Sequence, residues 1–155
     1  MSRLNKKLTV KTESEMRALA AKLADASFAG GFIALFGGLG AGKTAFVKGF
    51  CARFGILEVS SPTFNIVKRY ESGDTAIDHF DCYRLADADE LFAMGFDEYL
   101  QSTGIILMEW SENVIDALPL ERLEVHISGS GSEPREAELV SFGADYDSII
   151  EEINL

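Results

Sequence analysis

The sequence is poor in cysteine, histidine and proline, and this scarcity limits the classes of protein to consider. Its 155 residues include two cysteines, two histidines and three prolines. Cys51 and Cys82 do not have the spacing of metal ligands, and two thiols are too few for a disulfide framework, so we assign them no chemistry and expect a reducing, cytoplasmic compartment. The polar N-terminus does not resemble a signal peptide, and no apolar run approaches the length of a membrane span.

Positive charge is scarce as well. The chain has 14 Lys and Arg residues against 25 Asp and Glu residues, a formal net charge of -11. Binding of nucleic acid through the protein's own surface requires clustered Lys and Arg, so any link to RNA is expected to be indirect. The acidic stretches at residues 74–98 and 133–152 are typical of solvated faces, and less often of a surface that docks a basic partner. The length favours one α/β domain over two.

The most informative segment is residues 37–44, which read GGLGAGKT and match the phosphate-binding pattern G-x-x-x-x-G-K-[ST]. Glycines let successive backbone N–H groups surround a phosphate, Lys43 can reach the β- and γ-phosphates, and Thr44 can offer its hydroxyl to Mg²⁺. The alternative is a glycine-rich turn that matches by chance. We favour nucleotide binding, because the apolar run at residues 32–36 predicts a strand before the loop and apolar spacing at residues 43–54 predicts a helix after it. The expected nucleotide contacts in this segment are Gly37, Gly38, Leu39, Gly40, Ala41, Gly42, Lys43, Thr44 and Ala45.

The remaining patterns predict a mixed α/β fold. Capping-box patterns start helices at Thr12 and Asp87, and Gly95 keeps the second of these short. We expect an α/β, P-loop NTPase-like three-layer α/β/α sandwich, whose mixed sheet has a parallel core and antiparallel edge hairpins. The other expected elements are strands at residues 63–70, 75–80, 105–108, 122–128 and 135–142, with a terminal helix at residues 145–153.

Two carboxylates at predicted strand ends are candidates for the second half of the site. Glu109 directly follows the apolar run at residues 105–108, where a carboxylate can hold Mg²⁺ or its water shell; the alternative is an ordinary surface carboxylate. Asp81 lies at the exit of the strand at residues 75–80, where catalytic groups collect. Trp110 is expected either to stack against the nucleotide or to fill the core.

Two further features near these carboxylates have ordinary structural explanations. Alternation along the strand puts His79 and Asp81 on the same face, and a lone histidine there is more often a structural residue than a base. The stiff loop at residues 60–63 (SSPT) is either a plain turn or a switch that senses the γ-phosphate.

Several motifs occur together with the GLGAGKT loop: SPTF at residues 61–64, HFDCYRL at residues 79–85, a short acidic helix with Gly95, and MEW at residues 108–110. In this combination the chain resembles the TsaE family, also called YjeE, over residues 32–112. The resemblance implies a small ATPase that acts with partners of the TsaB and TsaD families. Together these proteins make the threonylcarbamoyladenosine modification of tRNAs that read codons beginning with A. This chain would therefore contact tRNA only indirectly, through the complex.

The resemblance also implies roles for individual residues, with ATP and Mg²⁺ as the cofactors. Lys43, Asp81 and Glu109 would be the catalytic set, with Asp81 near the γ-phosphate, and Thr44 and Glu109 would take the magnesium side. Thr63 would belong to the switch-like loop, and Trp110 would lie beside the nucleotide. The family typically has Asp where this chain has Gly38, and glycine keeps the backbone cradle because it can adopt any conformation that Asp adopts.

Three other functions share parts of this pattern. A small-molecule kinase has the same loop, but usually brings several arginines to a lid, and here only Arg84 falls in a motif region. A GTP-dependent switch would need Asp-x-x-Gly and Asn-Lys-x-Asp elements, which the sequence lacks. A non-catalytic nucleotide-binding scaffold would be excluded by measurable, mutation-sensitive turnover.

Overall fold

The computed structural model describes residues 3–153, apart from the side chain of Thr63. Within this range the chain forms seven strands, five α-helices and two 3₁₀-helices. In chain order they are β1 (Asn5–Val10), α1 (Glu13–Ala26), β2 (Phe32–Phe36), α2 (Lys43–Ala52), η1 (Thr63–Asn65), β3 (Val67–Ser72), β4 (Thr75–Asp81), α3 (Ala88–Ala93), α4 (Phe96–Gln101), β5 (Ile105–Glu109), η2 (Ser111–Ala117), β6 (Arg122–Ser128), β7 (Arg135–Phe142) and α5 (Ala144–Glu152).

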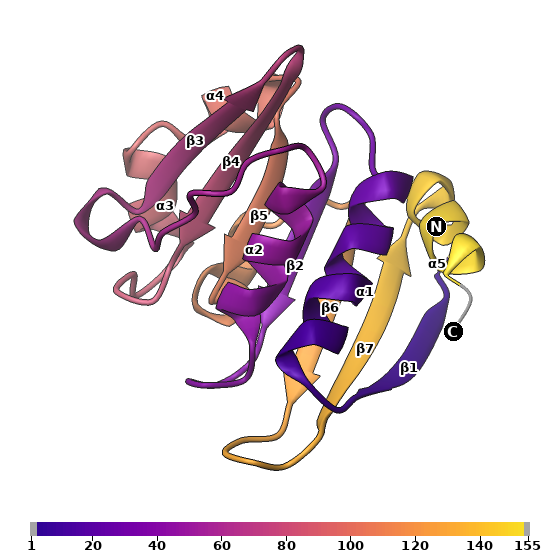
Figure 1. Ribbon diagram of the computed structural model, residues 1–155. Coiled ribbons are helices and arrows are strands. Elements are labelled where there is room, and N and C mark those ends of the chain that lie inside the picture. Colours follow the sequence, from indigo (N-terminus) through magenta and orange to yellow (C-terminus); the bar gives the residue numbers. More distant parts are fainter. Residues whose placement is uncertain (1–2, 154–155) are drawn as a thin grey trace.

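The strands form one mixed sheet in the order β1-β7-β6-β2-β5-β4-β3 (Figure 1). Its centre is parallel, because β2 pairs in parallel with both β6 and β5, and β5 pairs in parallel with β4. Towards the edges, β3 is antiparallel to β4, β7 is antiparallel to β6, and β1 is antiparallel to β7. The predicted parallel core with antiparallel hairpins at its edges is therefore confirmed.

Helices cover both faces of this sheet, as the three-layer prediction requires. The core on one face contains buried side chains of α1, α2 and α5, and the core on the other contains side chains of α3, α4 and η2. The two cysteines lie one in each core, and burial raises the pKa of both thiols to about 12. Thiols with such a pKa stay protonated at neutral pH and are poor nucleophiles.

The predicted helix starts follow from local chemistry. The Thr12 side chain accepts a hydrogen bond from the Glu15 backbone N–H at 3.0 Å and caps α1, and Asp87 caps α3 in the same way at 3.1 Å from Glu90 N. Gly95 separates α3 from α4 with φ 90°, a conformation that glycine adopts without a steric penalty.

Two sequence interpretations need correction. The strand expected at residues 63–70 begins only at Val67, because η1 follows Pro62 and Ile66 has φ 67°, which breaks the extended run. The N-terminal segment, for which the sequence suggested no element, forms β1 and pairs with β7 from Asn5 opposite Val140 to Val10 opposite Arg135. Among the described residues, no helix is long and apolar enough to cross a membrane.

Candidate functional site

The glycine loop, residues 37–44, connects the end of β2 to the start of α2, as the sequence predicted. Gly37, Gly40 and Gly42 have φ values of 154°, 74° and 114°, which side chains rarely adopt. A Cβ at Gly37 would lie 2.7 Å from the backbone oxygen of Ile127. Glycine at these positions lets the loop turn tightly from β2 into α2 while it passes close to the backbone of β6 at Ile127.

Lys43 is folded back over the loop. Its Nζ donates hydrogen bonds to the backbone oxygens of Gly37 and, at 3.2 Å, of Gly38, and lies 3.7 Å from the ring centroid of Trp110. Burial lowers the pKa of Lys43, an effect that the carboxylates of Glu112, Glu109 and Asp81 oppose. The ammonium group thus contacts two carbonyl oxygens and the face of an aromatic ring. An anionic ligand can replace these contacts.

A cavity of about 450 Å³ opens beside this loop. It brings together nearly all of the site residues that the sequence predicted, and adds three that it did not: Glu13, Lys48 and Tyr83. The predicted residues that line it are Gly38, Leu39, Gly40, Ala41, Gly42, Lys43, Thr44, Ala45, Asp81, Glu109 and Trp110. Gly37 does not line the cavity, and the side chain of Thr63 lies outside the described part of the structure.

The two candidate carboxylates reach this cavity from neighbouring strands. Asp81 of β4 and Glu109 of β5 are register partners in the parallel pair, so their side chains leave the sheet on the same face. Asp81 accepts hydrogen bonds from Ser61 Oγ at 3.1 Å and from the Tyr83 backbone N–H at 3.0 Å. Glu109 is 5% exposed and lies 2.6 Å from the ring nitrogen Nε2 of His79.

The donors fit Mg²⁺ that arrives with a nucleotide better than a metal held by protein alone. Within residues 3–153, no group of three or more His, Cys, Asp or Glu side chains could hold a metal ion. The Thr44 hydroxyl and the Glu109 carboxylate do line one cavity, and Asp81 lines it too. Magnesium in phosphoryl-transfer sites is typically bound by one or two such oxygens, with phosphates and water completing the octahedron.

The loop before η1 is fastened to the site by its serines. Besides the contact between Ser61 and Asp81, the Tyr70 hydroxyl donates to the backbone oxygen of Ser60 at 3.0 Å, and Lys68 Nζ donates to Ser60 Oγ at 2.8 Å. Phe64, in the adjacent η1, is 79% exposed, and its ring centroid lies 4.6 Å from the guanidinium carbon of Arg84. The Ser61 contact joins this loop directly to a candidate catalytic carboxylate, and the Ser60 contacts attach the loop to β3.

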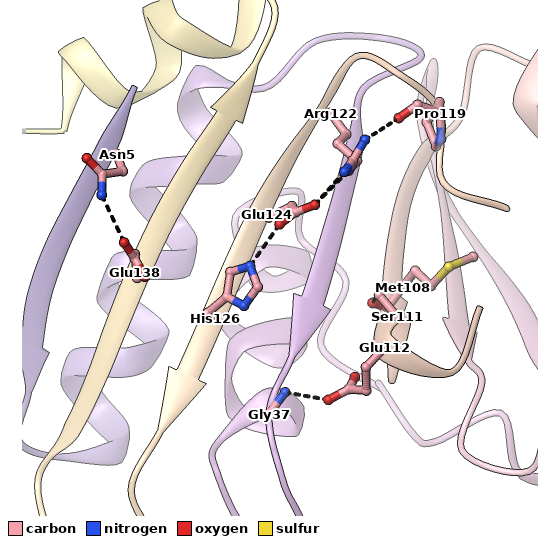
Figure 2. Close-up of polar contacts among 10 residues, drawn as sticks. All are labelled: Asn5, Gly37, Met108, Ser111, Glu112, Pro119, Arg122, Glu124, His126 and Glu138. Atoms are coloured by element: carbon pink, nitrogen blue, oxygen red, sulfur yellow. Dashed lines mark hydrogen bonds and ion pairs between the residues drawn. The ribbon is translucent and has the colours of Figure 1, made fainter. Parts of the chain in front are cut away.

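Sequence reasoning missed two side chains that hold the glycine loop. Glu112 Oε2 accepts a hydrogen bond from the Gly37 backbone N–H at 3.1 Å, and Figure 2 shows the carboxylate directed at that nitrogen. Arg135, at the start of β7, donates to the backbone oxygens of Gly40 at 3.0 Å and Ala41 at 3.1 Å. Both lie more than 70 positions along the chain from the residue that they hold, so no local spacing could have identified them.

A second cavity, of about 350 Å³, adjoins the first along residues 40–42 of the glycine loop. The turn between β1 and α1 forms one side of it and the β6–β7 hairpin forms another. Thr12, Ser132 and Arg135 contribute polar groups to its lining, and Val10 and Met16 contribute apolar ones.

These features define a mixed α/β protein whose seven-stranded sheet presents a glycine loop and two carboxylates to one cavity. The sequence model of the family described as "Threonylcarbamoyl adenosine biosynthesis protein TsaE" matches residues 10–137. The chain belongs to the TsaE family.

Individual relatives agree with this assignment. The chain is 40% identical to the tRNA threonylcarbamoyladenosine biosynthesis protein TsaE of Bacillus subtilis (strain 168), over 90% of this chain and 88% of that one. It is 34% identical to the protein of the same name from Rickettsia conorii, over 86% of this chain and 77% of that one. The crystal structure of YdiB from Bacillus subtilis superposes with a TM-score of 0.84 at 32% identity, and the match covers 98% of this chain and 95% of that one.

Proposed function

We propose that this protein is the ATP-binding and ATP-hydrolysing component of the machinery that makes threonylcarbamoyladenosine in tRNA. The convergence of Lys43, Thr44, Asp81 and Glu109 on one cavity beside the glycine loop carries the proposal. Its membership of the TsaE family gives the process, and proteins of the TsaB and TsaD families are the proposed partners. The proposal treats the chain as one domain, which agrees with a single sheet that includes both its first and its last strand.

Each residue has a defined part in this reaction. Backbone N–H groups of the glycine loop and the start of α2 bind phosphate oxygens, and Lys43 leaves its carbonyl partners to pair with the β- and γ-phosphates. Thr44 and Glu109 would hold Mg²⁺, which neutralises phosphate charge as the γ-phosphate leaves. Asp81 accepts a proton from, or orients, the attacking water. Trp110 forms the wall of the cavity on the side of Lys43.

The second cavity is suited to the nucleoside. It continues from the cavity proposed for the phosphates, and its lining combines apolar side chains, which can contact a flat base, with polar and charged groups that can bind a ribose. Thr12 lies at its edge, and Arg135 fixes the loop carbonyls of Gly40 and Ala41 between the two cavities. We propose that the base and ribose occupy this space.

The loop at residues 60–63 supplies a route by which hydrolysis can affect the partner proteins. Ser61 Oγ donates to Asp81, and the oxygens of a γ-phosphate near Asp81 would compete for that hydroxyl. Loss of the γ-phosphate would then change the position of this loop and of the adjacent η1, whose exposed Phe64 is available to a partner. We propose that the work of hydrolysis is this conformational change.

The main alternative is a small-molecule kinase. Such an enzyme usually brings several arginines to a lid over its acceptor, yet within the described residues no arginine lines the cavity beside the glycine loop. The guanidinium of Arg84 lies over the ring of Phe64. The ATPase is therefore the function that the site supports best.

The proposal is tested by ATP turnover of the purified chain, alone and then with TsaB and TsaD family proteins and tRNA. We expect slow turnover alone, stimulation in the complex, and loss of both in Lys43→Ala, because the phosphates then lose their main cationic partner. Lys7→Ala, on the exposed face of the edge strand β1, is the matched control and should behave as the wild type. Equal rates alone and in the complex would reject the partner-controlled ATPase. Turnover that requires a small acceptor would indicate the kinase.

A further inference from the structure

A buried histidine that does not line the cavity contacts Glu109. His79 is 2% exposed, and its Nε2 lies 2.6 Å from Glu109 Oε2. The two residues belong to the adjacent parallel strands β4 and β5 and leave the sheet on the face that α1 and α2 cover. The pair therefore forms the floor of the site, where water has little access to either group.

The other ring nitrogen identifies the tautomer. Within the described residues, His79 Nδ1 is the buried side-chain polar atom that has no hydrogen-bond partner. A proton on Nδ1 would be a buried donor without an acceptor, in either the neutral or the charged ring, and that is costly. An Nε2–H that donates to Glu109 Oε2, with no hydrogen on Nδ1, leaves no buried donor without an acceptor.

The imidazole ring is itself held in place. Tyr70 of β3 stacks on His79 with ring centroids 6.2 Å apart and planes 27° apart. The Tyr70 hydroxyl in turn is fixed by hydrogen bonds with the backbone oxygen and nitrogen of Ser60, at 3.0 and 3.3 Å. The direction of the Nε2–H bond is thus set by groups on three different segments of the chain.

We propose that His79 is a positioning residue that holds Oε2 of Glu109 and so directs the other carboxylate oxygen, Oε1, into the cavity toward Mg²⁺ or a magnesium-bound water. The inference rests on the proposed function, because it gives Glu109 the magnesium-side role. Hydrogen bonds to a ligating carboxylate typically change metal affinity by about 10- to 100-fold, because they fix the orientation of the ligand. A side chain that merely filled the core would have no such effect on Mg²⁺.

The chain contains one tryptophan, Trp110, which lines the cavity, so we expect its fluorescence to change when a nucleotide binds. The experiment titrates ADP into the wild type, His79→Leu and His79→Gln, first with Mg²⁺ and then with EDTA. Leu keeps the apolar volume and removes the donor, whereas the Gln amide nitrogen reaches the position of Nε2. We expect His79→Leu to lose about tenfold of the Mg²⁺-dependent gain in affinity while binding in EDTA changes little, and His79→Gln to retain most of that gain.

The outcomes separate this inference from the proposed function. An equal Mg²⁺ effect in the wild type and His79→Leu would overturn the positioning role, as would an equal loss in His79→Leu and His79→Gln. A wild type that binds no ADP in either condition would reject the proposed function and the positioning role with it. If thermal melting shows that His79→Leu is unfolded, His79→Asn takes its place, because its shorter amide is polar but does not reach Glu109.

Discussion

At the scale of single residues, the two carboxylates of the site differ in ways that predict different roles. Glu109 is buried against His79, whereas Asp81 is half-buried and accepts from Ser61 and the Tyr83 backbone. We expect Glu109→Gln to lower the apparent affinity for Mg²⁺ in ATP turnover by at least about tenfold, because the neutral amide is a weak magnesium ligand. Asp81→Asn should lower the maximal rate and leave the Mg²⁺ dependence nearly unchanged. Turnover measured across a Mg²⁺ titration distinguishes the two.

Ser61→Ala is the control for this comparison, since it removes a hydrogen bond to Asp81 without touching either charge. A shift in Mg²⁺ dependence with Asp81→Asn and none with Glu109→Gln would exchange the two roles.

The sequence predicted which side chains line this site better than it predicted the side chains that hold them in place. Lys43, Thr44, Asp81, Glu109 and Trp110 were predicted from the loop pattern, from strand ends and from the family resemblance, and all five line one cavity. The roles of these residues in catalysis and in metal binding stay predictions. The contacts of Glu112, Arg135 and His79 depend on which strands lie side by side, and a single sequence does not give that order.

At the scale of elements, the contact between α1 and α2 sets the position of the helix that follows the glycine loop. The two helices approach closely at Gly49, where an added Cβ would lie 2.5 Å from the Cα and backbone oxygen of Arg17. Gly49→Ala gains about 1 kcal/mol of helix propensity, but it must push apart two backbones. We expect a net loss of about 1–3 kcal/mol in the free energy of unfolding, measured by urea denaturation.

Gly38→Ala is the matched control, because a Cβ there meets no atom within 4 Å. Its stability should stay within about 0.5 kcal/mol of the wild type, as is usual for exposed substitutions. Unchanged stability in Gly49→Ala would mean that the helices separate at little cost and that Gly49 does not fix their distance.

Elements with strong local signals were predicted well, and elements defined by distant partners were not. β6 and β7 have the predicted bounds, and α5 differs from its predicted range by one residue at each end. β1 escaped notice because only two of its six residues, Leu8 and Val10, are apolar and buried, and the strand is defined by its pairing with the distant β7. The strand expected at residues 63–70 failed because Ile66 has a positive φ that β-branched residues rarely adopt.

At the scale of the whole molecule, the negative net charge disfavours direct binding of tRNA to this protein. With 14 basic and 25 acidic side chains, the formal net charge of -11 repels a polyanion, and tight RNA binding needs several Lys or Arg contacts to phosphates. We expect the isolated chain to leave the fluorescence anisotropy of labelled tRNA unchanged at about 0.15 M salt. Anisotropy should rise once the proposed partners of the TsaB and TsaD families are added, because in the proposed complex they would provide the RNA contacts.

The same measurement at low salt is the control, because unscreened repulsion should weaken any contact further, whereas attraction to a hidden basic patch would strengthen it. Saturable binding of tRNA by the chain alone, with an affinity that falls steeply as salt is added, would contradict the prediction. It would show that a local cluster of basic residues outweighs the net charge and that this protein contacts the RNA directly.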